Sequence, residues 1–176
     1  AFQGDVYQGL EAATLKKGDL KFAQKHLRIL SGLYGVLKPL DLMAPYRLEM
    51  GTKLSTKKHD DLYGFWKDTL TADINAQLAE QKDSTLINLA SNEYFNALNK
   101  KDIAGDIVSP VFKDFKNGDY KIISFFAKKA RGMMARYIID NKVINSDGLA
   151  TFNYGGYKFN AKLSQDNAPT FTRKTS

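Results

Sequence analysis

The chain has 176 residues, 43% hydrophobic and 26% charged, which suits one folded domain and excludes an intrinsically disordered protein. Cysteine is absent, so disulfides, thiolate catalysis and cysteine-ligated zinc or iron–sulfur sites are excluded within it. The formal net charge of +7 favours polyanionic partners, nucleic acid first and acidic membrane surfaces second.

The first half of the chain predicts two helices joined by a segment that contains glycines and prolines. Asp19 is placed as the N-cap of the first helix, which is expected to end at 31–35. Its apolar face follows helical spacing and comprises Phe22, His26, Ile29, Leu30 and Leu33. Lys21, Lys25 and Arg28 fall on the opposite face and form a basic stripe. The second helix is predicted from Asp61 to Glu80.

The second half mixes short strands with helices. A buried strand is expected at 85–90, followed by a short helix that Ser91 caps. Asn117-Gly118 predicts a tight hairpin between 107–115 and 119–126. A third helix is expected at 127–143, and strands at 149–159 and 170–173. The pattern predicts an α+β fold, in which residues 1–176 form a single mixed domain with a β-hairpin and several amphipathic helices.

The most distinctive local feature is the basic segment of the third helix. Four cations lie opposite its apolar side, namely Lys128, Lys129, Arg131 and Arg136. Gly132 lies among them and is expected to leave room for a phosphate or a sugar. Such a surface suits neutralisation of a nucleic-acid backbone, because each phosphate contact releases counterions. The alternative is an ordinary solvated helix face.

The glycines after the first helix allow a second phosphate site. A helix that runs into Gly32-Leu33-Tyr34-Gly35, followed by Lys38, resembles a helix-hairpin-helix element whose backbone N–H groups bind phosphate. The spacing of the two glycines differs from that of the usual hairpin, and a plain helix C-cap explains the segment equally well.

Several polar residues at predicted strand ends and turns suggest an enzyme as the alternative. A pocket formed by Tyr46, Arg47, Glu49, Asn88, Ser91 and Glu93, with Lys128, would suit a nucleic acid or a small phosphorylated substrate. Tyr46, Arg47 and Glu49 are most simply explained by an ion pair, and Glu93 by its place at a helix start. The two histidines are far apart in sequence, so neither a metal site nor a cofactor is predicted.

Long segments of the chain are similar to a known family. Residues 26–43, which read HLRILSGLYGVLKPLDLM, resemble the signature of the YaaA family, and so do 45–51, 87–95 and 122–131. The likeness covers nearly the whole chain. Members of that family carry an additional N-terminal part, so the resemblance implies that the chain corresponds to the C-terminal two thirds of such a protein.

The resemblance implies a cytoplasmic bacterial protein of the response to hydrogen peroxide, which limits damage linked to intracellular iron. It also implies DNA binding through a helix-hairpin-helix-like element and a positively charged cleft on an unusual α and β fold. The hairpin then falls on 31–38, and the basic cleft draws on Lys128, Lys129 and Arg131. The expected partner is duplex or distorted DNA bound with weak sequence preference, and no membrane is expected. No oligomeric state is predicted.

Overall fold

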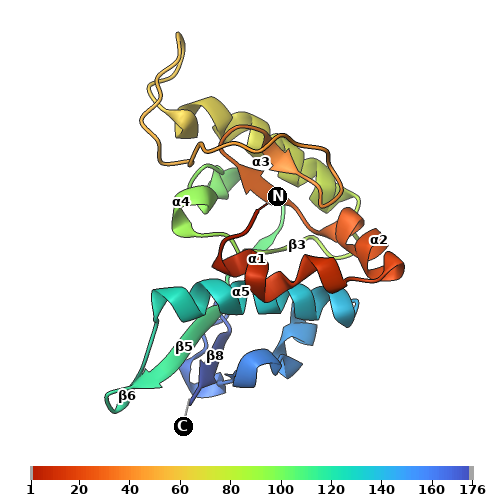
Figure 1. Ribbon diagram of the computed structural model, residues 1–176, viewed down its shortest axis with the longest axis vertical. Coiled ribbons are helices and arrows are strands. Elements are labelled where there is room, and N and C mark those ends of the chain that lie inside the picture. The colour runs from red at the N-terminus through yellow and green to blue at the C-terminus, as the bar shows by residue number, and fades with distance from the viewer. Residues whose placement is uncertain (1, 175–176) are drawn as a thin grey trace. The chain divides into compact units, whose positions relative to one another are not determined.

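The computed structural model describes residues 2–174, in which helices and short strands alternate (Figure 1). By their contacts these residues form two compact units. Unit 1 comprises 23–86 and 90–106, and unit 2 comprises 2–22, 87–89 and 107–174. The chain passes between the units within helix α2 (Lys17–His26), within β3 (Thr85–Ile87), between 89 and 90, and within β4 (Asp106–Val108), which pairs with β3 in a small sheet. The predicted α+β class is confirmed, whereas the single-domain organisation stays a prediction.

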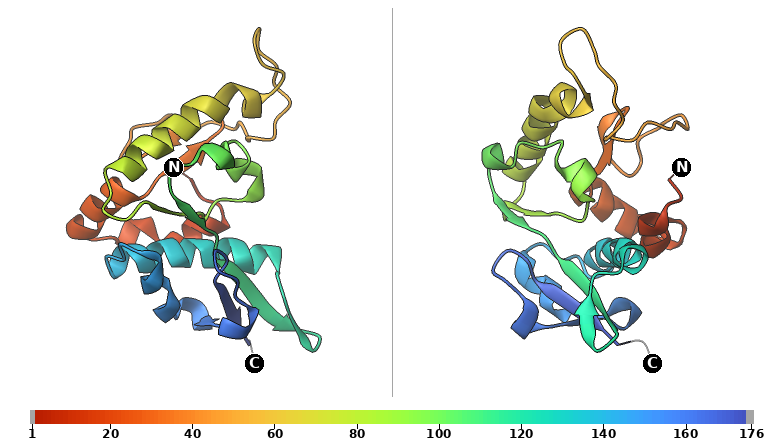
Figure 2. Two further views of the ribbon diagram at one scale, coloured as in Figure 1. Left: turned by 180° about the vertical axis from the view of Figure 1, so that it is seen from behind. Right: turned by 90° about the vertical axis from the view of Figure 1, so that its left-hand side faces the viewer.

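Unit 1 is organised around α3 (Leu62–Ala79), which the sequence predicts closely. Asp61 is its N-cap, and the carboxylate accepts a hydrogen bond from the Gly64 N–H at 2.8 Å. The loop before this helix extends away from it (Figures 1 and 2). The short α4 (Asn92–Phe95) begins at Ser91, whose Oγ accepts from the Tyr94 N–H as predicted. The 3₁₀ helix η2 (Lys100–Asp102) follows.

The first predicted helix is shorter than expected, because a β-hairpin replaces its last turn. Helix α2 ends at His26, and β1 (Ile29–Ser31) pairs antiparallel with β2 (Gly35–Leu37). Helix α3 packs on β2, and the Trp66 Nε1 donates a hydrogen bond to the Gly32 carbonyl at 2.9 Å. No further helix occurs in the described residues between β2 and α3, so a helix-hairpin-helix element is not confirmed.

Unit 2 contains a four-stranded sheet in the order β6-β5-β8-β7. Strands β5 (Val111–Lys116) and β6 (Asp119–Lys121) form the predicted hairpin, in which Asn117 and Gly118 adopt positive φ of 55° and 83°. Strand β8 (Thr170–Arg173), also predicted, runs parallel to β5 and antiparallel to β7 (Lys158–Phe159). The strand predicted at 149–159 is confirmed only at its end, in β7, because η3 (Ser146–Thr151) and η4 (Tyr154–Gly156) occupy most of that segment. Helix η5 (Ala161–Leu163) joins β7 to β8.

The core of unit 2 lies between this sheet and α5 (Ser124–Asp140), which begins three residues before the predicted start (Figures 1 and 2). Aromatic rings dominate it, and Phe112 contacts three of them in Phe152, Tyr157 and Phe171. Alternation along β5 accounts for this burial, since residues two apart on a strand share a face. The helix contributes Ala130, Met134 and Tyr137 to the same core.

Helix α1 (Asp5–Leu10), which ends at its C-cap Glu11 and is followed by η1 (Ala12–Thr14), packs along α5 at unusually short range. A Cβ on Gly132 would lie 1.8 Å from the Val6 carbonyl oxygen, and one on Gly9 would lie 2.1 Å from that of Lys129. Both glycines are therefore required for the approach of the two backbones. Gly132 is buried, so the expectation that it leaves room for phosphate is wrong.

Candidate nucleic-acid interface

Helix α5 carries an excess of positive charge in its first half. Its 17 residues hold four cations and a single carboxylate, Asp140 at the C-terminal end. Lys128 and Lys129 are exposed and Arg131 is half-buried, and burial lowers the pKa of the Arg131 guanidinium. None of these three takes part in an ion pair within the described residues. The single carboxylate is engaged elsewhere, so the three charges are uncompensated.

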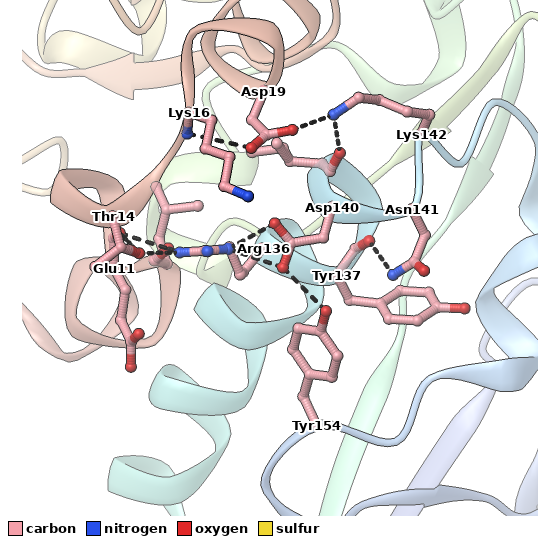
Figure 3. A network of polar contacts seen from close by, with 12 residues as sticks. Glu11, Thr14, Lys16, Asp19, Arg136, Tyr137, Asp140, Asn141, Lys142 and Tyr154 are labelled. Carbon is pink, nitrogen blue, oxygen red and sulfur yellow. Dashed lines mark hydrogen bonds and ion pairs between the residues drawn. The ribbon is translucent and has the colours of Figure 1, made fainter.

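Arg136 differs from the other three cations of the helix, as Figure 3 shows. Its Nε donates to both carboxylate oxygens of Asp140, at 2.8 and 2.9 Å. Its Nη1 donates to the carbonyl oxygens of Leu10 and Glu11 and to the Thr14 Oγ1. The predicted nucleic-acid role of Arg136 is untested, but in this structure its donors hold α1 and η1 against α5.

A second ion pair fastens the start of α2 to the end of α5. The Lys142 ammonium group donates to a carboxylate oxygen of Asp19 (Figure 3). It also lies 5.2 Å from the centroid of the Phe22 ring. The Asp19 carboxylate also accepts a hydrogen bond from the Lys16 N–H. These bonds, the one from Lys142 first, lower the pKa of Asp19.

In the basic stripe predicted on α2, as on α5, some cations are exposed and one is bound within the fold. Lys21 and Lys25 are exposed, as a binding surface requires. Arg28 is half-buried and its Nη1 donates to the carbonyl oxygens of Gln24 and Leu27, at 3.0 and 2.7 Å. Because these carbonyls lie at the helix end, Arg28 satisfies acceptors that the helix itself leaves unpaired. Burial lowers its pKa.

The glycine turn does not present the free amides of a phosphate nest. The N–H groups of Leu33 and Tyr34 both donate to the Ser31 Oγ, at 3.3 and 2.9 Å. A Cβ on Gly32 would lie 2.4 Å from the Leu48 carbonyl oxygen, and Gly35 has a φ of +76° beneath the Trp66 ring. The glycines are thus explained by packing and by turn geometry. Lys38 is exposed after the hairpin.

Part of the predicted pocket is assembled in unit 1. The Tyr46 hydroxyl lies 2.5 Å from the Oγ of Ser31, a fully buried side chain, and the Gly51 N–H donates to Glu93 at 2.9 Å. Burial raises the pKa of Tyr94, and the neighbouring Tyr46, Glu93 and Glu49 raise it further. Tyr46, Glu49 and Glu93 therefore lie near enough to Tyr94 to act on its charge.

The other predicted pocket residues have separate partners. Asn88 belongs to unit 2, where its Nδ2 donates to the Ser109 Oγ at 3.2 Å, and Ser91 caps α4. The ion pair expected within Tyr46, Arg47 and Glu49 is wrong, because Arg47 is exposed and takes part in no ion pair of the described residues. Three of the six residues predicted to form an enzyme pocket therefore lie near one another, around Tyr94. The enzyme hypothesis stays a prediction.

A buried polar network was not predicted from the sequence. Asp114 accepts a hydrogen bond from the Tyr157 hydroxyl at 2.6 Å and one from the Arg173 Nε at 2.6 Å. Burial, followed by the bond to Asp114, raises the pKa of Tyr157. Arg173 also lies over the rings of Tyr157 and Phe126. The alternation that places Asp114 on the face of Phe112 is the one sequence signal for this network.

Two classes of site receive no support from the structure. Among residues 2–174, no group of three or more His, Asp or Glu side chains is arranged to hold a metal ion. None of the described helices combines the length and the apolarity that a membrane span requires.

Comparison with known proteins gives consistent matches. A family model described as Peroxide stress protein YaaA matches residues 1–163. A UPF0246 protein of Shewanella woodyi is 59% identical over 174 residues, which cover 99% of this chain and 68% of the relative. A UPF0246 protein of Colwellia psychrerythraea is 56% identical over 176 residues, 100% of this chain and 68% of that protein. One of Shewanella oneidensis is 58% identical over 174 residues, with 99% and 68% covered.

Proposed function

We propose, on the premise that this chain belongs to the peroxide stress protein YaaA family, that it is a DNA-binding protein of the peroxide stress response. It acts in the bacterial cytoplasm and limits the DNA damage that peroxide causes together with iron. It contacts mainly the phosphates of duplex or distorted DNA, and it reads little sequence. Membership of the family supports the role in peroxide stress, and the charge distribution of α5 supports DNA binding.

The observation that carries this proposal is the charge balance of α5. Asp140 pairs with Arg136, so three of the four cations of the helix, Lys128, Lys129 and Arg131, have no carboxylate partner among residues 2–174. Three uncompensated cations within one helical turn repel one another, and this repulsion is relieved when a polyanion binds. The DNA backbone offers such an anion at every nucleotide.

The position of these cations along the helix adds to the attraction. They follow the first turn of α5, which is the positive end of the helix dipole and contains no acidic residue. The N-cap residue Ile123 supplies no side-chain acceptor, so the first N–H groups of the helix keep their donor capacity. Side-chain charge and backbone dipole therefore have the same sign at this end of α5.

The test is fluorescence-anisotropy binding of the chain to a labelled duplex across a salt series. The variant Lys128→Gln/Lys129→Gln/Arg131→Gln removes the three charges. The matched control is Lys53→Gln/Lys57→Gln/Lys58→Gln, which removes the same charge from exposed positions of the loop before α3. For three phosphate contacts, we expect the slope of log Kd against log salt to fall by about 3 in the α5 variant.

The control variant is expected to keep both its affinity and its salt slope to within about one contact, since net charge alone acts weakly at physiological salt. Circular dichroism establishes that both variants are folded. Equal losses of duplex affinity in the two variants would mean that net charge alone causes the effect. An affinity that does not depend on salt concentration would exclude phosphate contacts altogether. Either outcome overturns the proposal.

A further inference from the structure

One face of the sheet in unit 2 packs in the core, and the opposite face carries lysines and aromatic rings. Phe112 and Asp114 of β5 are buried, so Lys113 and Phe115, which alternate with them, lie on the opposite face. The strand register extends this face sideways, because Tyr120 is paired with Phe115, Thr172 with Lys113, and Lys158 with Thr172. We call these residues, together with Lys174, the outer sheet face: Lys113, Phe115, Tyr120, Lys158, Thr172 and Lys174.

Two aromatic rings lie side by side on the outer sheet face. The ring centroids of Phe115 and Tyr120 are 5.3 Å apart, in an edge-to-face arrangement. Phe115 is 37% exposed, as expected for a residue that lies on the side of β5 opposite the core. The hairpin that carries both rings extends away from α5 (Figure 1). Phe115 and Tyr120 thus form an aromatic platform on the β5–β6 hairpin.

The charge of the outer sheet face has one sign. Its ionisable side chains are Lys113, Lys158, Lys174 and the phenol of Tyr120, and no carboxylate belongs to it. None of the three lysines takes part in an ion pair within the described residues. The Lys174 ammonium group instead lies 4.6 Å from the centroid of the Phe115 ring. The lysines therefore extend positive charge from Phe115 across β5, β8 and β7, on the side of the rings away from β6.

We infer that the outer sheet face binds single-stranded nucleic acid. Bases stack on Phe115 and Tyr120, and the ammonium groups of Lys113, Lys158 and Lys174 contact the phosphates. Sheet faces that combine exposed aromatic rings with cations recognise unpaired strands in this way, because every base has a π face and every nucleotide a charge. The inference rests on the proposed function in naming nucleic acid as the ligand, but it assigns a second surface, separate from the cations of α5.

The chemistry of the outer sheet face favours a single strand over a duplex. In a duplex the bases are stacked on one another, so the exposed ring of Phe115 would gain no stacking partner from it. A base that stacks on Phe115 takes the place of Lys174, and the displaced ammonium group is then free to approach a phosphate. Because an exposed cation–π contact is weaker than base stacking on the same ring, this exchange is favourable.

The test measures anisotropy of a labelled oligothymidylate of about 12 nucleotides, within the site sizes of single-strand binding folds, beside a duplex of equal length. The variant is Phe115→Ala/Tyr120→Ala. Its conservative counterpart, Phe115→Tyr/Tyr120→Phe, keeps both rings, and Phe65→Ala removes an exposed phenylalanine of unit 1 as the control. We expect the alanine variant to lose about tenfold or more in single-strand affinity, while the ring-preserving variant and the control stay near the wild type.

Each outcome separates this inference from the proposed function. Duplex binding that depends on Lys128, Lys129 and Arg131, with single-strand binding unchanged in the alanine variant, keeps the proposed function and overturns the inference. A wild-type chain that binds neither oligonucleotide overturns both. Sedimentation with vesicles that contain anionic phospholipid tests the other polyanionic surface. Loss of vesicle binding in the alanine variant, with single-strand binding unchanged, would assign the face to membranes instead.

If Phe115→Ala/Tyr120→Ala does not fold, the variant Phe115→Leu tests the same inference. Leucine keeps the apolar volume at the edge of the sheet and removes the aromatic π face. Its thermal unfolding should match that of the wild type, and its single-strand affinity should still fall. A folded Phe115→Leu chain with wild-type affinity overturns the inference as well.

Discussion

Arg173 forms a buried ion pair with Asp114 across the parallel strands β5 and β8, with 2.6 Å between the Nε and Oδ1 atoms. The Asp114 side chain is 1% exposed, and its other oxygen accepts the hydrogen bond of the Tyr157 hydroxyl. The guanidinium group also donates to the Gly155 carbonyl oxygen at 3.1 Å. One arginine therefore joins the sheet to η4 through a carboxylate that is almost wholly shielded from water.

Removal of Arg173 should destabilise unit 2 strongly. Arg173→Leu leaves the Asp114 charge buried and without its cation, which costs about 3–5 kcal/mol in comparable pairs. Urea denaturation monitored by circular dichroism measures the loss. The control Asp166→Asn removes an exposed carboxylate that belongs to no ion pair of the described residues, and it should change the free energy of unfolding by less than about 0.5 kcal/mol. Equal stabilities of the two variants would contradict the role of the pair.

The contact between Gly132 and α1 predicts opposite results for two glycine substitutions. Gly132→Ala places a Cβ against the Val6 carbonyl oxygen and should cost about 1–3 kcal/mol, as overpacked sites do. Gly18 lies in α2, and a Cβ added there would meet no atom within 4 Å, so Gly18→Ala should stabilise the helix by up to about 1 kcal/mol. Thermal unfolding of the two variants checks the opposite signs. A stable Gly132→Ala chain would mean that α1 and α5 can move apart freely.

The pKa of His26 makes stability depend on pH. Burial, and then repulsion from Lys25 and Arg28, lowers this pKa below 6.5, so the unfolded chain binds the proton more readily than the folded chain. The neutral imidazole therefore stabilises the fold above about pH 6.5, and this stabilisation is lost as the pH falls further, by at most about 1.4 kcal/mol per pH unit.

Denaturation series at about pH 7.5 and about pH 5.5 check this dependence. The variant His26→Gln should show a smaller loss of stability between the two pH values than the wild type. His59→Gln, which removes the other histidine, should keep the wild-type dependence. If both variants lose stability as the wild type does, other groups cause the pH dependence.

The elements that the sequence predicts well have strong local determinants. Helix α3 has an N-cap in Asp61 and a long apolar face, and the β5–β6 hairpin has Asn117-Gly118, whose positive φ values suit few other residues. Local preference and tertiary packing agree at these positions. Their bounds follow from the sequence to within a few residues.

The elements that it predicts poorly depend on distant contacts. Ile29 and Leu30 continue the helical spacing of α2, but they pair with Leu37 and Val36, and the hairpin packs on α3. In the sequence, Gly132 similarly suggests free space between cations, whereas in the structure α1 occupies that space. The candidate site is likewise only partly predictable. Sequence spacing identifies the four cations of α5, but only the fold shows that Arg136 is paired with Asp140 while the other three are not.

Arg136 and the remaining cations of α5 should therefore respond in opposite ways to substitution. Arg136→Met removes the bonds to Asp140, Leu10, Glu11 and Thr14, and we expect it to lower the free energy of unfolding by about 1–3 kcal/mol. Its duplex affinity, measured well below the unfolding temperature, should change by less than about threefold, because its charge is already balanced by Asp140.

The variant Lys128→Gln/Lys129→Gln should show the reverse pattern. Both side chains are exposed and outside the ion pairs of residues 2–174, so the free energy of unfolding should change by less than about 0.5 kcal/mol. Duplex affinity should nevertheless fall, with a salt slope lower by about 2. If folded Arg136→Met lost as much affinity and as much salt slope as the lysine variant, Arg136 would belong to the interface, and α5 would bind DNA along its whole length.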